Sequence, residues 1–239
     1  MQETENSRVL VVCAHPDDVD VNAAGTLHQW ALDGAEITLL VVTSGDAGGH
    51  GSVERESIVA TRQAEQRAAA KLLGLAETRF LEGYRDGEVT VTAELVRDIT
   101  RVIRQIRPSK LMTMSTERDW SNIAQGHPDH LAVGEAAVRA FYPFARNPHA
   151  FPGQADMADL QHWVVEELWL QAPPNPNKII DVTDVLEQKL AAILCHASQF
   201  EDPEAVSQFL RQRMLESGAR HGLGEGRAAE TFTVVCGRH

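Results

Sequence analysis

Cysteine and basic residues are both scarce in this sequence of 239 residues. The three cysteines, Cys13, Cys195 and Cys236, are odd in number and form no CxxC pair, which argues against a disulfide framework and against a thiolate zinc site. We expect all three to be buried thiols. The 22 Lys and Arg residues are outnumbered by 34 Asp and Glu residues, and the net charge of -12 repels phosphate backbones and anionic lipids. Nucleic acid and membrane surfaces are therefore not expected partners.

Long apolar runs are also lacking. None approaches the length of a membrane span, and residues 1–7 lack the basic start and apolar middle of a signal peptide. We therefore expect a cytoplasmic protein. With 43% apolar residues, a chain of this length can bury one sizeable core without requiring a second. We expect a single domain over residues 1–239, while the oligomeric state stays open and a homo-oligomer is compatible with the sequence.

Strand and helix patterns alternate along the chain, which is typical of a Rossmann-like α/β fold with a mostly parallel sheet and helices on both faces. The clearest strands are short, β-branched and nearly all apolar, as strands buried on both faces should be. Strands are predicted over 8–13, 36–43, 110–114, 164–170, 178–182 and 231–236. Helices are predicted over 53–73, 94–106 and 185–198, and surface loops over 142–153 and 218–226.

The sequence AHPDD at 14–18 follows the first predicted strand directly. A dinucleotide-binding fold would have a GxGxxG turn here, whereas this loop offers an imidazole and two carboxylates, a set that suits a cation. His15 and Asp18 are three residues apart across a tight turn, so both can reach one ion at about 2 Å. Taken alone, the motif fits equally well a structural role in which His15 and the aspartates cap the strand and the next helix.

A second cluster of the same character, GHPDH at 126–130, follows a later predicted strand. His127 and His130 are three residues apart at a helix start and face the same side. Taken alone, this cluster would also fit a hydrated helix start with Asp129 near the positive end of the helix dipole. Because the carboxyl ends of parallel strands meet where ligands bind, we expect the two clusters to form one metal site. Histidine and carboxylate ligands without cysteine favour a catalytic zinc with an open position.

The paired motifs resemble those of the LmbE-like, or PIG-L, family of zinc-dependent N-acetylglucosaminyl deacetylases. Weaker matches extend the resemblance over nearly the whole chain. They are Gly25-Thr26-Leu27, Arg62, Glu65, Leu73-Gly74, Phe80-Leu81, Asp86-Gly87, Asp181, Lys189, His196-x-Ser198-Gln199 and Glu230.

The resemblance implies that His15, Asp18 and His130 bind one Zn²⁺ per chain, although such ligands also accept other divalent metals such as Fe²⁺. Three protein ligands leave a fourth position for water, whose pKa zinc can lower from ~15.7 to about 7. Many family members have Glu directly after HPDD, where this chain has Val19. Asp20 is a candidate replacement for that carboxylate.

The resemblance further implies that Asp17 is the general base, and that His127, oriented by Asp129, stabilises the oxyanion or donates a proton. The implied reaction removes an N-acyl group, most simply acetyl, from an amino sugar or amino-sugar conjugate. Two alternatives stay open: an amidase acting on a thiol-sugar conjugate, and a catalytically inactive metal-binding partner in a biosynthetic pathway. Metal-dependent phosphoester hydrolysis would need more carboxylate ligands, to hold two metals, and a basic substrate cleft. The net charge of -12 gives this alternative no support.

Several residues are candidates for the surroundings of the site. Family members use the position of Arg62 to contact substrate, whereas a solvated charge is its ordinary interpretation; Asp86 has similar status. Arg146, in the Pro-rich loop, is a further candidate for contact with a hydroxylated or anionic substrate. The Gly-rich loop at 45–51, with His50 as an extra ligand, is either a lid or a flexible loop without chemistry. His196 either lines the cleft or docks its helix.

Overall fold

The computed structural model describes residues 7–49, 55–120, 123 and 126–237. Within these residues, seven strands form one sheet in the order β3-β2-β1-β4-β5-β7-β6. The strands are β1 (Arg8–Cys13), β2 (Glu36–Val41), β3 (Glu77–Phe80), β4 (Lys110–Met114), β5 (Glu167–Gln171), β6 (Lys178–Asp181) and β7 (Ala229–Cys236). The strands β1 to β5 run parallel to one another, and β7 runs antiparallel to both β5 and β6. The predicted fold class, a mostly parallel α/β sheet, is confirmed.

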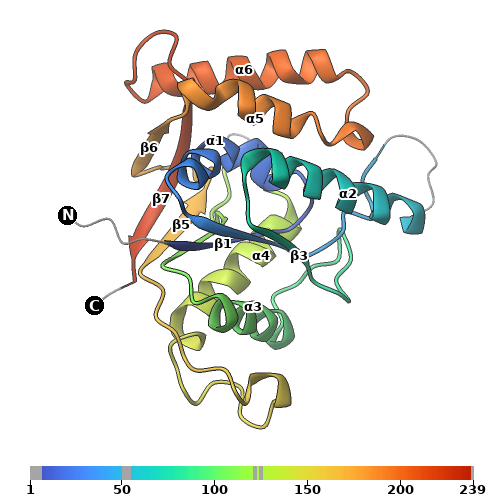
Figure 1. Ribbon diagram of the computed structural model, residues 1–239, viewed down its shortest axis with the longest axis vertical. Coiled ribbons are helices and arrows are strands. Elements are labelled where there is room, and N and C mark those ends of the chain that lie inside the picture. The colour runs from blue at the N-terminus through green and yellow to red at the C-terminus, as the bar shows by residue number, and fades with distance from the viewer. Residues whose placement is uncertain (1–6, 50–54, 121–122, 124–125, 238–239) are drawn as a thin grey trace.

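Helices cover both faces of the sheet (Figure 1). They are α1 (Asp18–Leu32), α2 (Arg55–Leu73), α3 (Ala93–Ile106), α4 (Pro128–Arg139), α5 (Leu186–Ile193) and α6 (Pro203–Arg220). Shorter helical segments span Ala140–Phe144, Ala155–Met157, Thr183–Val185 and Ala197–Gln199. The helices α3 and α4 lie on one face, whereas α1 and α2 lie on the other, with α5 and α6 stacked outside them. None of these helices has the length and apolar composition needed to span a bilayer.

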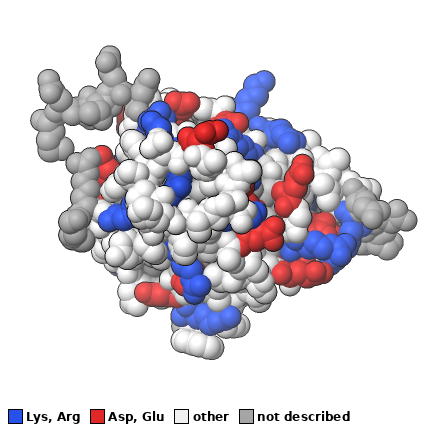
Figure 2. Space-filling view, turned by 90° about the horizontal axis from the view of Figure 1, so that it is seen from below, with Lys and Arg blue, Asp and Glu red and all other residues white. Residues whose placement is uncertain are grey.

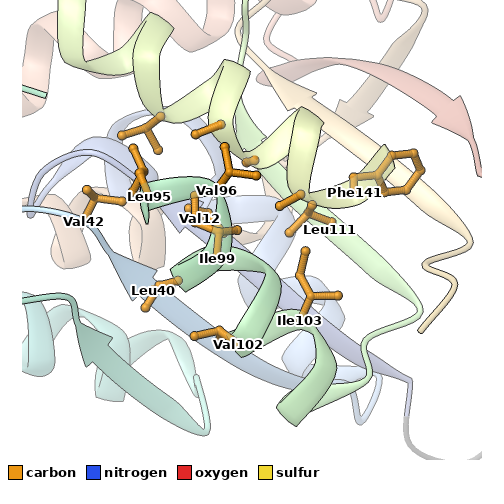
Figure 3. Close-up of a cluster of buried hydrophobic side chains, with 14 of the residues drawn as sticks. Val12, Leu40, Val42, Leu95, Val96, Ile99, Val102, Ile103, Leu111 and Phe141 are labelled. Atoms are coloured by element: carbon orange, nitrogen blue, oxygen red, sulfur yellow. The ribbon is translucent and has the colours of Figure 1, made fainter. Parts of the chain in front are cut away.

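Two apolar layers hold the sheet between its helices. Residues of β1 alternate between them, so that Leu10 and Val12 face α3 and α4 while Val9, Val11 and Cys13 face α1. This two-sided burial explains why the central strands are apolar at nearly every position and do not alternate between apolar and polar residues. On the α3 side, Leu95, Ile99 and Ile103 recur at helical spacing and pack over Val12, Leu40 and Leu111 (Figure 3).

Some predicted boundaries are wrong by a few residues. The strand predicted over 36–43 ends at Val41, although the next two N–H groups still donate to the carbonyls of Cys13 and Ala14. The strand predicted over 164–170 begins only at Glu167. The helix predicted over 185–198 ends at Ile193, because the following residues form tight turns that carry His196 toward α1.

Two further expectations need correction. Cys13 is buried, but Cys195 is only partly buried and Cys236 is exposed, because β7 ends at an uncovered margin of the sheet where Val235 is also exposed. The loop predicted over 218–226 starts too early, since α6 continues to Arg220. Glycine is needed at position 218, inside α6, because a Cβ there would collide with the backbone carbonyl of Arg227.

On the face of the described residues seen in Figure 2, basic side chains lie among acidic ones.

Candidate metal centre and cleft

The two His-Pro-Asp motifs lie together at the carboxyl edge of the sheet. The first follows β1 and runs into α1, and the second forms the start of α4 after the loop that leaves β4. Because β1 and β4 are neighbouring parallel strands, their carboxyl ends bring both motifs to the same edge, as predicted. Pro128 suits the first turn of α4, where its missing N–H group would have no helical partner.

His15, Asp18 and His130 converge at this edge. His130 Nε2 lies 2.9 Å from Asp18 Oδ1 and 3.3 Å from His15 Nδ1, and His15 Nδ1 lies 3.6 Å from Asp18 Oδ2. Two nitrogen ligands at about 2.0 Å from a tetrahedral zinc lie about 3.3 Å apart. The three side chains therefore have the chemistry and spacing that fit one zinc ion.

Two carboxylates hold the opposite side of the His15 ring. Nε2 lies 3.1 Å from Asp86 Oδ1 and 3.0 Å from Asp129 Oδ2, so this nitrogen carries a proton. Histidines that bind metals usually donate their second N–H to such an acceptor, which directs the lone pair of the other nitrogen toward the ion. Here the other nitrogen is Nδ1, which faces Asp18 and His130.

Other groupings of potential ligands come close to the same point. Ligand atoms of His15, His127 and His130 lie within 4.8 Å of one another, as do those of His15, Asp86 and Asp129. A metal held by the second set would displace the Nε2 proton that joins the two carboxylates to the ring. The geometry therefore favours a metal on the Nδ1 side, with His127 beside it.

Neighbouring charges fix the protonation of His15 and Asp18. Burial lowers the pKa of His15, but hydrogen bonds to Asp18 and Asp86 outweigh this effect and raise the pKa to about 11. Burial raises the pKa of Asp18, yet the charge of His130 and the hydrogen bonds from both histidines bring it far below its usual range. Without a metal, a His15 imidazolium thus neutralises the surrounding carboxylates, and a metal ion would replace its Nδ1 proton.

Asp17 lies beside these residues in a strained conformation. Its φ of 91° is in the left-handed region, which is unfavourable for a residue with a Cβ. Two side chains of α2 hold it there: Gln66 Oε1 accepts its backbone N–H at 2.8 Å, and Arg62 Nη2 donates to its Oδ2 at 3.0 Å. Burial, reinforced by the charge of Asp18 and opposed by that of Arg62, raises the pKa of Asp17 to about 6. This carboxyl can therefore exchange a proton near neutral pH.

His127 caps the start of α4, and its ring lies edge-on to that of His15 with centroids 4.9 Å apart. Its Nδ1 accepts the backbone N–H of Asp129 at 3.2 Å, which leaves the proton of the neutral ring on Nε2. Burial, with the charges of His15 and His130, lowers the pKa of His127. The carboxylate of Asp129 does not orient this ring: it accepts from His15 and from the N–H groups of Gly87 and Val89.

The three candidate substrate contacts lie in different places. Arg62 is only 3% exposed, so its interpretation as a solvated surface charge is wrong. Asp86 is also buried, against His15 and the backbone of Ala47. Arg146 is not brought to the centre: it donates to the carbonyl of Gly237, at the amino end of β5 and thus at the opposite edge of the sheet.

The described part of the Gly-rich loop packs on the Arg62 guanidinium, which donates to the carbonyl of Gly45 at 2.9 Å. Gly48 lies so close that any Cβ there would collide with Arg62. A larger residue at this position would displace the guanidinium of Arg62 from its place beside the loop. His50, which is the extra ligand proposed for this loop, and Gly51 lie outside the described residues.

A buried polar network behind Asp17 resolves the role of His196. Asp20 Oδ2 lies 2.8 Å from His196 Nε2 and accepts from Gln66 Nε2 at 2.8 Å, and all three residues are fully buried. His196 thus docks its segment against α1. Gln66 was not predicted as a site residue, although it follows Arg62 by one helical turn and so shares its face of α2.

A cavity of about 200 Å³ opens beside the centre, with Asp17, Asp18 and His130 on one wall and Gln171 and Arg213 on another. Gln171 and Arg213 were not predicted, because nothing in the sequence links β5 and α6 to the two motifs. Larger cavities lie elsewhere, beside the loop after α4 and beside β3, but neither is lined by the clustered histidines.

Similarity to known proteins covers most of the chain. The sequence model of the family described as PIG-L, GlcNAc-PI de-N-acetylase, matches residues 10–141. Diacetylchitobiose deacetylase of Thermococcus kodakarensis is 29% identical over 236 residues, covering 96% of this chain and 86% of its own. A 1D-myo-inositol 2-acetamido-2-deoxy-alpha-D-glucopyranoside deacetylase of Rhodococcus erythropolis is 31% identical over 252 residues, covering 84% of each chain.

The similarity extends to three dimensions. The solved structure of N,N'-diacetylchitobiose deacetylase from Pyrococcus horikoshii has a TM-score of 0.86 and 29% sequence identity to this chain. The match covers 97% of this chain and 84% of that one. The whole sheet and its helical layers are therefore shared.

Proposed function

This chain belongs to the PIG-L family, and from that membership we propose that it hydrolyses the N-acyl amide, most simply an acetamide, of an amino sugar or amino-sugar conjugate. The proposal depends on one observation above all. His15, Asp18 and His130 converge with metal-ligand spacing directly beside Asp17, a carboxyl group whose pKa is raised to about 6. The relatives named above, which act on acetylated amino sugars, support this class of substrate.

We assign His15, Asp18 and His130 as the ligands of one Zn²⁺, with Fe²⁺ as an alternative occupant. When bound, the metal supplies a Lewis acid that polarises the amide carbonyl and lowers the pKa of a water molecule. Asp86 and Asp129 keep the proton on His15 Nε2 and so present Nδ1 as the ligand atom.

Asp17 acts as the general base in this proposal. Arg62 holds its Oδ2, which leaves Oδ1 to accept the proton of the attacking water. The same carboxyl group can then pass this proton to the amine nitrogen as the C–N bond breaks, so that the base is regenerated within one turnover.

For His127, the lowered pKa and the hydrogen bond to Nδ1 favour the first of its two predicted roles. The neutral ring keeps a proton on Nε2 and can donate a hydrogen bond to the oxygen that becomes negative in the transition state. Asp129 supports this arrangement through its backbone N–H. Arg62 and Asp86 are buried and bonded to Asp17 and to His15, so we assign them to positioning these two residues rather than to contact with sugar hydroxyls. The position of Arg146 gives it no part in the cleft.

Hydrolysis of a thiol-sugar conjugate would use the same groups on a larger amide, and only substrate assays separate the two activities. An inactive metal-binding partner is disfavoured by the paired presence of Asp17 and His127. The test is metal analysis of the purified protein combined with amine release from N-acetylglucosamine and N,N'-diacetylchitobiose. We expect stoichiometric zinc or iron and free amine; protein without metal and without amine release would refute the proposal.

A further inference from the structure

The peptide group between Pro16 and Asp17 is held from both sides by α2. Arg62 Nη2 donates to the carbonyl of Pro16 at 2.8 Å, and Gln66 Oε1 accepts the N–H of Asp17 at 2.8 Å. Arg62 and Gln66 lie one helical turn apart, so both project from the same face of α2. The orientation of this peptide group sets the left-handed φ of Asp17, and with it the direction of the proposed base.

The amide of Gln66 can make this contact in one orientation only. Its oxygen faces an N–H group, which can only donate, and its Nε2 donates to Asp20 Oδ2 at 2.8 Å. Exchanging the amide oxygen and nitrogen would place the NH2 group against the N–H of Asp17 and the oxygen against the carboxylate of Asp20. Asp20 therefore determines which atom of Gln66 faces Asp17.

His196 holds the same oxygen of Asp20. Its Nε2 lies 2.8 Å from Oδ2, and because a carboxylate oxygen accepts, this nitrogen carries a proton. The second oxygen, Oδ1, has no hydrogen-bond partner in the described part of the chain, so both donors of this network converge on one atom. Asp20, Gln66 and His196 are all fully buried, so bulk water does not compete for these contacts.

The segment that carries His196 is itself anchored on α2. Ser198 donates to Glu65 from its backbone N–H at 2.8 Å and from its Oγ at 2.7 Å, and Glu65 directly precedes Gln66 in the sequence. His196 is therefore fixed between α1, through Asp20, and α2, through Ser198. The contacts of Ser198 alone would dock the segment, so the bond from His196 to Asp20 calls for a further role.

We infer that His196 is a positioning residue for the general base: through Asp20 it fixes the amide of Gln66, and through that amide the backbone of Asp17. The inference rests on the proposed function, in which Asp17 takes the proton of the attacking water. Among the described residues, Asp17 lines the cavity beside the metal centre, whereas the other three do not. Loss of the network should therefore misplace the base without weakening substrate binding, which lowers kcat and leaves KM unchanged.

Docking, charge and positioning by hydrogen bonds predict different outcomes. If His196 only docked its segment, removing it would lower the free energy of unfolding but leave kcat of the folded protein unchanged. Asp20→Asn removes the charge of this network yet keeps one oxygen that can accept from both Gln66 and His196, whereas Asp20→Leu loses that acceptor. Positioning by hydrogen bonds therefore predicts that Asp20→Asn retains more of kcat than Asp20→Leu, and equal losses would contradict it.

The first test compares His196→Phe with the matched control His28→Phe in zinc-loaded protein. His28 also joins α1 to α2, since its Nδ1 lies 3.0 Å from the carbonyl of Leu73, but among the described residues it is not bonded to this network. We expect kcat for N,N'-diacetylchitobiose to fall about tenfold in His196→Phe, with KM and metal content unchanged, and to stay at the wild-type value in His28→Phe. An unchanged kcat in His196→Phe, or an equal fall in both variants, would overturn the inference.

Gln66→Met provides the second test, because it removes the residue through which His196 is inferred to act. In a Gln66→Met background, His196→Phe should lower kcat by about twofold at most. If His196→Phe lowers kcat by the same factor in both backgrounds, His196 does not act through Gln66 and the inference fails.

Hydrogen exchange of the Asp17 N–H, followed by NMR, separates this inference from the proposed activity because it needs no substrate. We expect exchange about tenfold faster in His196→Phe than in the wild type, and unchanged exchange in His28→Phe. If His196→Phe does not fold, Asp20→Leu takes its place, since it removes the acceptor together with its buried charge. Unchanged exchange at Asp17 would overturn the positioning role, whereas faster exchange without any amine release by the wild type would count against the deacetylase proposal alone.

Discussion

At the scale of single residues, Asp17 combines two unfavourable features. Its backbone is left-handed, and its partly buried carboxyl group lies beside that of Asp18. Both are maintained by partners on α2, and such strain persists only where the surroundings over-determine it. A residue held in this way beside metal ligands is well suited to proton transfer, because its position does not relax when the substrate enters.

Replacing Asp17 with Asn should slow turnover while leaving the metal site intact. Asn keeps the shape and the contact with Arg62 but cannot accept the proton of the attacking water. The loss of a general base typically costs ~10²- to 10⁴-fold in rate. Amine release and metal analysis on the same preparation measure both effects. Full activity in Asp17→Asn, or protein that no longer binds metal, would contradict the role assigned to Asp17.

Gln66→Met should affect kcat more than KM. The variant removes the acceptor for the Asp17 N–H and one donor to Asp20, so the base loses its fixed position while the metal ligands remain. Leaving such buried groups unsatisfied costs about 1–3 kcal/mol of stability. Gln63→Met on the same helix, whose amide bonds Ser44 and Arg67 alone among the described residues, is the control. Equal changes in both variants would show that Gln66 has no special part in positioning Asp17.

The convergence of His15, Asp17, Asp18 and His130 could be predicted because each lies within a few residues of a strand end and in a compact motif. Gln66, Gln171 and Arg213 could not, because each reaches the site from a distant element. Only the tertiary arrangement of α2, β5 and α6 brings them there, and a single sequence carries no record of such contacts.

At the scale of elements, the accuracy of prediction followed the strength of the apolar pattern. The strands predicted over 8–13 and 110–114 coincide with β1 and β4, whose sides are both buried. The helix predicted over 94–106 differs from α3 by one residue, since its apolar residues recur on one face. By contrast, α6 was not predicted, because only Leu210, Met214 and Gly218 are buried along its 18 residues.

A buried ion pair joins three of these elements. Lys189 of α5 and Glu230 of β7 are both fully buried and 2.7 Å apart. Glu230 also accepts from the N–H groups of Gly25 and Thr26, and Lys189 donates to the carbonyls of Asp20 and Val21. These contacts fix α1, which begins with the proposed metal ligand Asp18, against the outer layer.

Lys189→Met should therefore destabilise the protein strongly. Removing one member of a buried pair leaves an uncompensated charge and typically costs about 3–5 kcal/mol in free energy of unfolding. The double variant Lys189→Met with Glu230→Gln removes both charges and should be more stable than Lys189→Met alone. Urea unfolding of the three proteins measures this difference. A double variant no more stable than the single one would indicate that the charge of Glu230 is tolerated without Lys189.

At the scale of the whole molecule, the parallel sheet sets the place of the chemistry before any side chain is considered. Neighbouring strands deliver their loops to one edge, and both motifs follow strands at the centre of the sheet. The sequence could predict this convergence from strand order along the chain. It could not predict the two antiparallel pairings of β7, because strand direction leaves no local signal in a short apolar run.

Removing the metal should abolish activity and lower the melting temperature without dividing the unfolding transition. A ligand that binds only the native state stabilises it by ~4.1 kcal/mol at 1,000 times its dissociation constant, so chelation should lower Tm by several degrees. The apoprotein should remain folded, because the His15 imidazolium neutralises Asp18 and Asp86 and the apolar layers lie away from the site. Calorimetry before and after chelation, with zinc added back as the control, measures both effects. One transition in each state agrees with a single domain over residues 1–239, whereas two resolved transitions would contradict it, and an unchanged Tm would argue that no metal was bound.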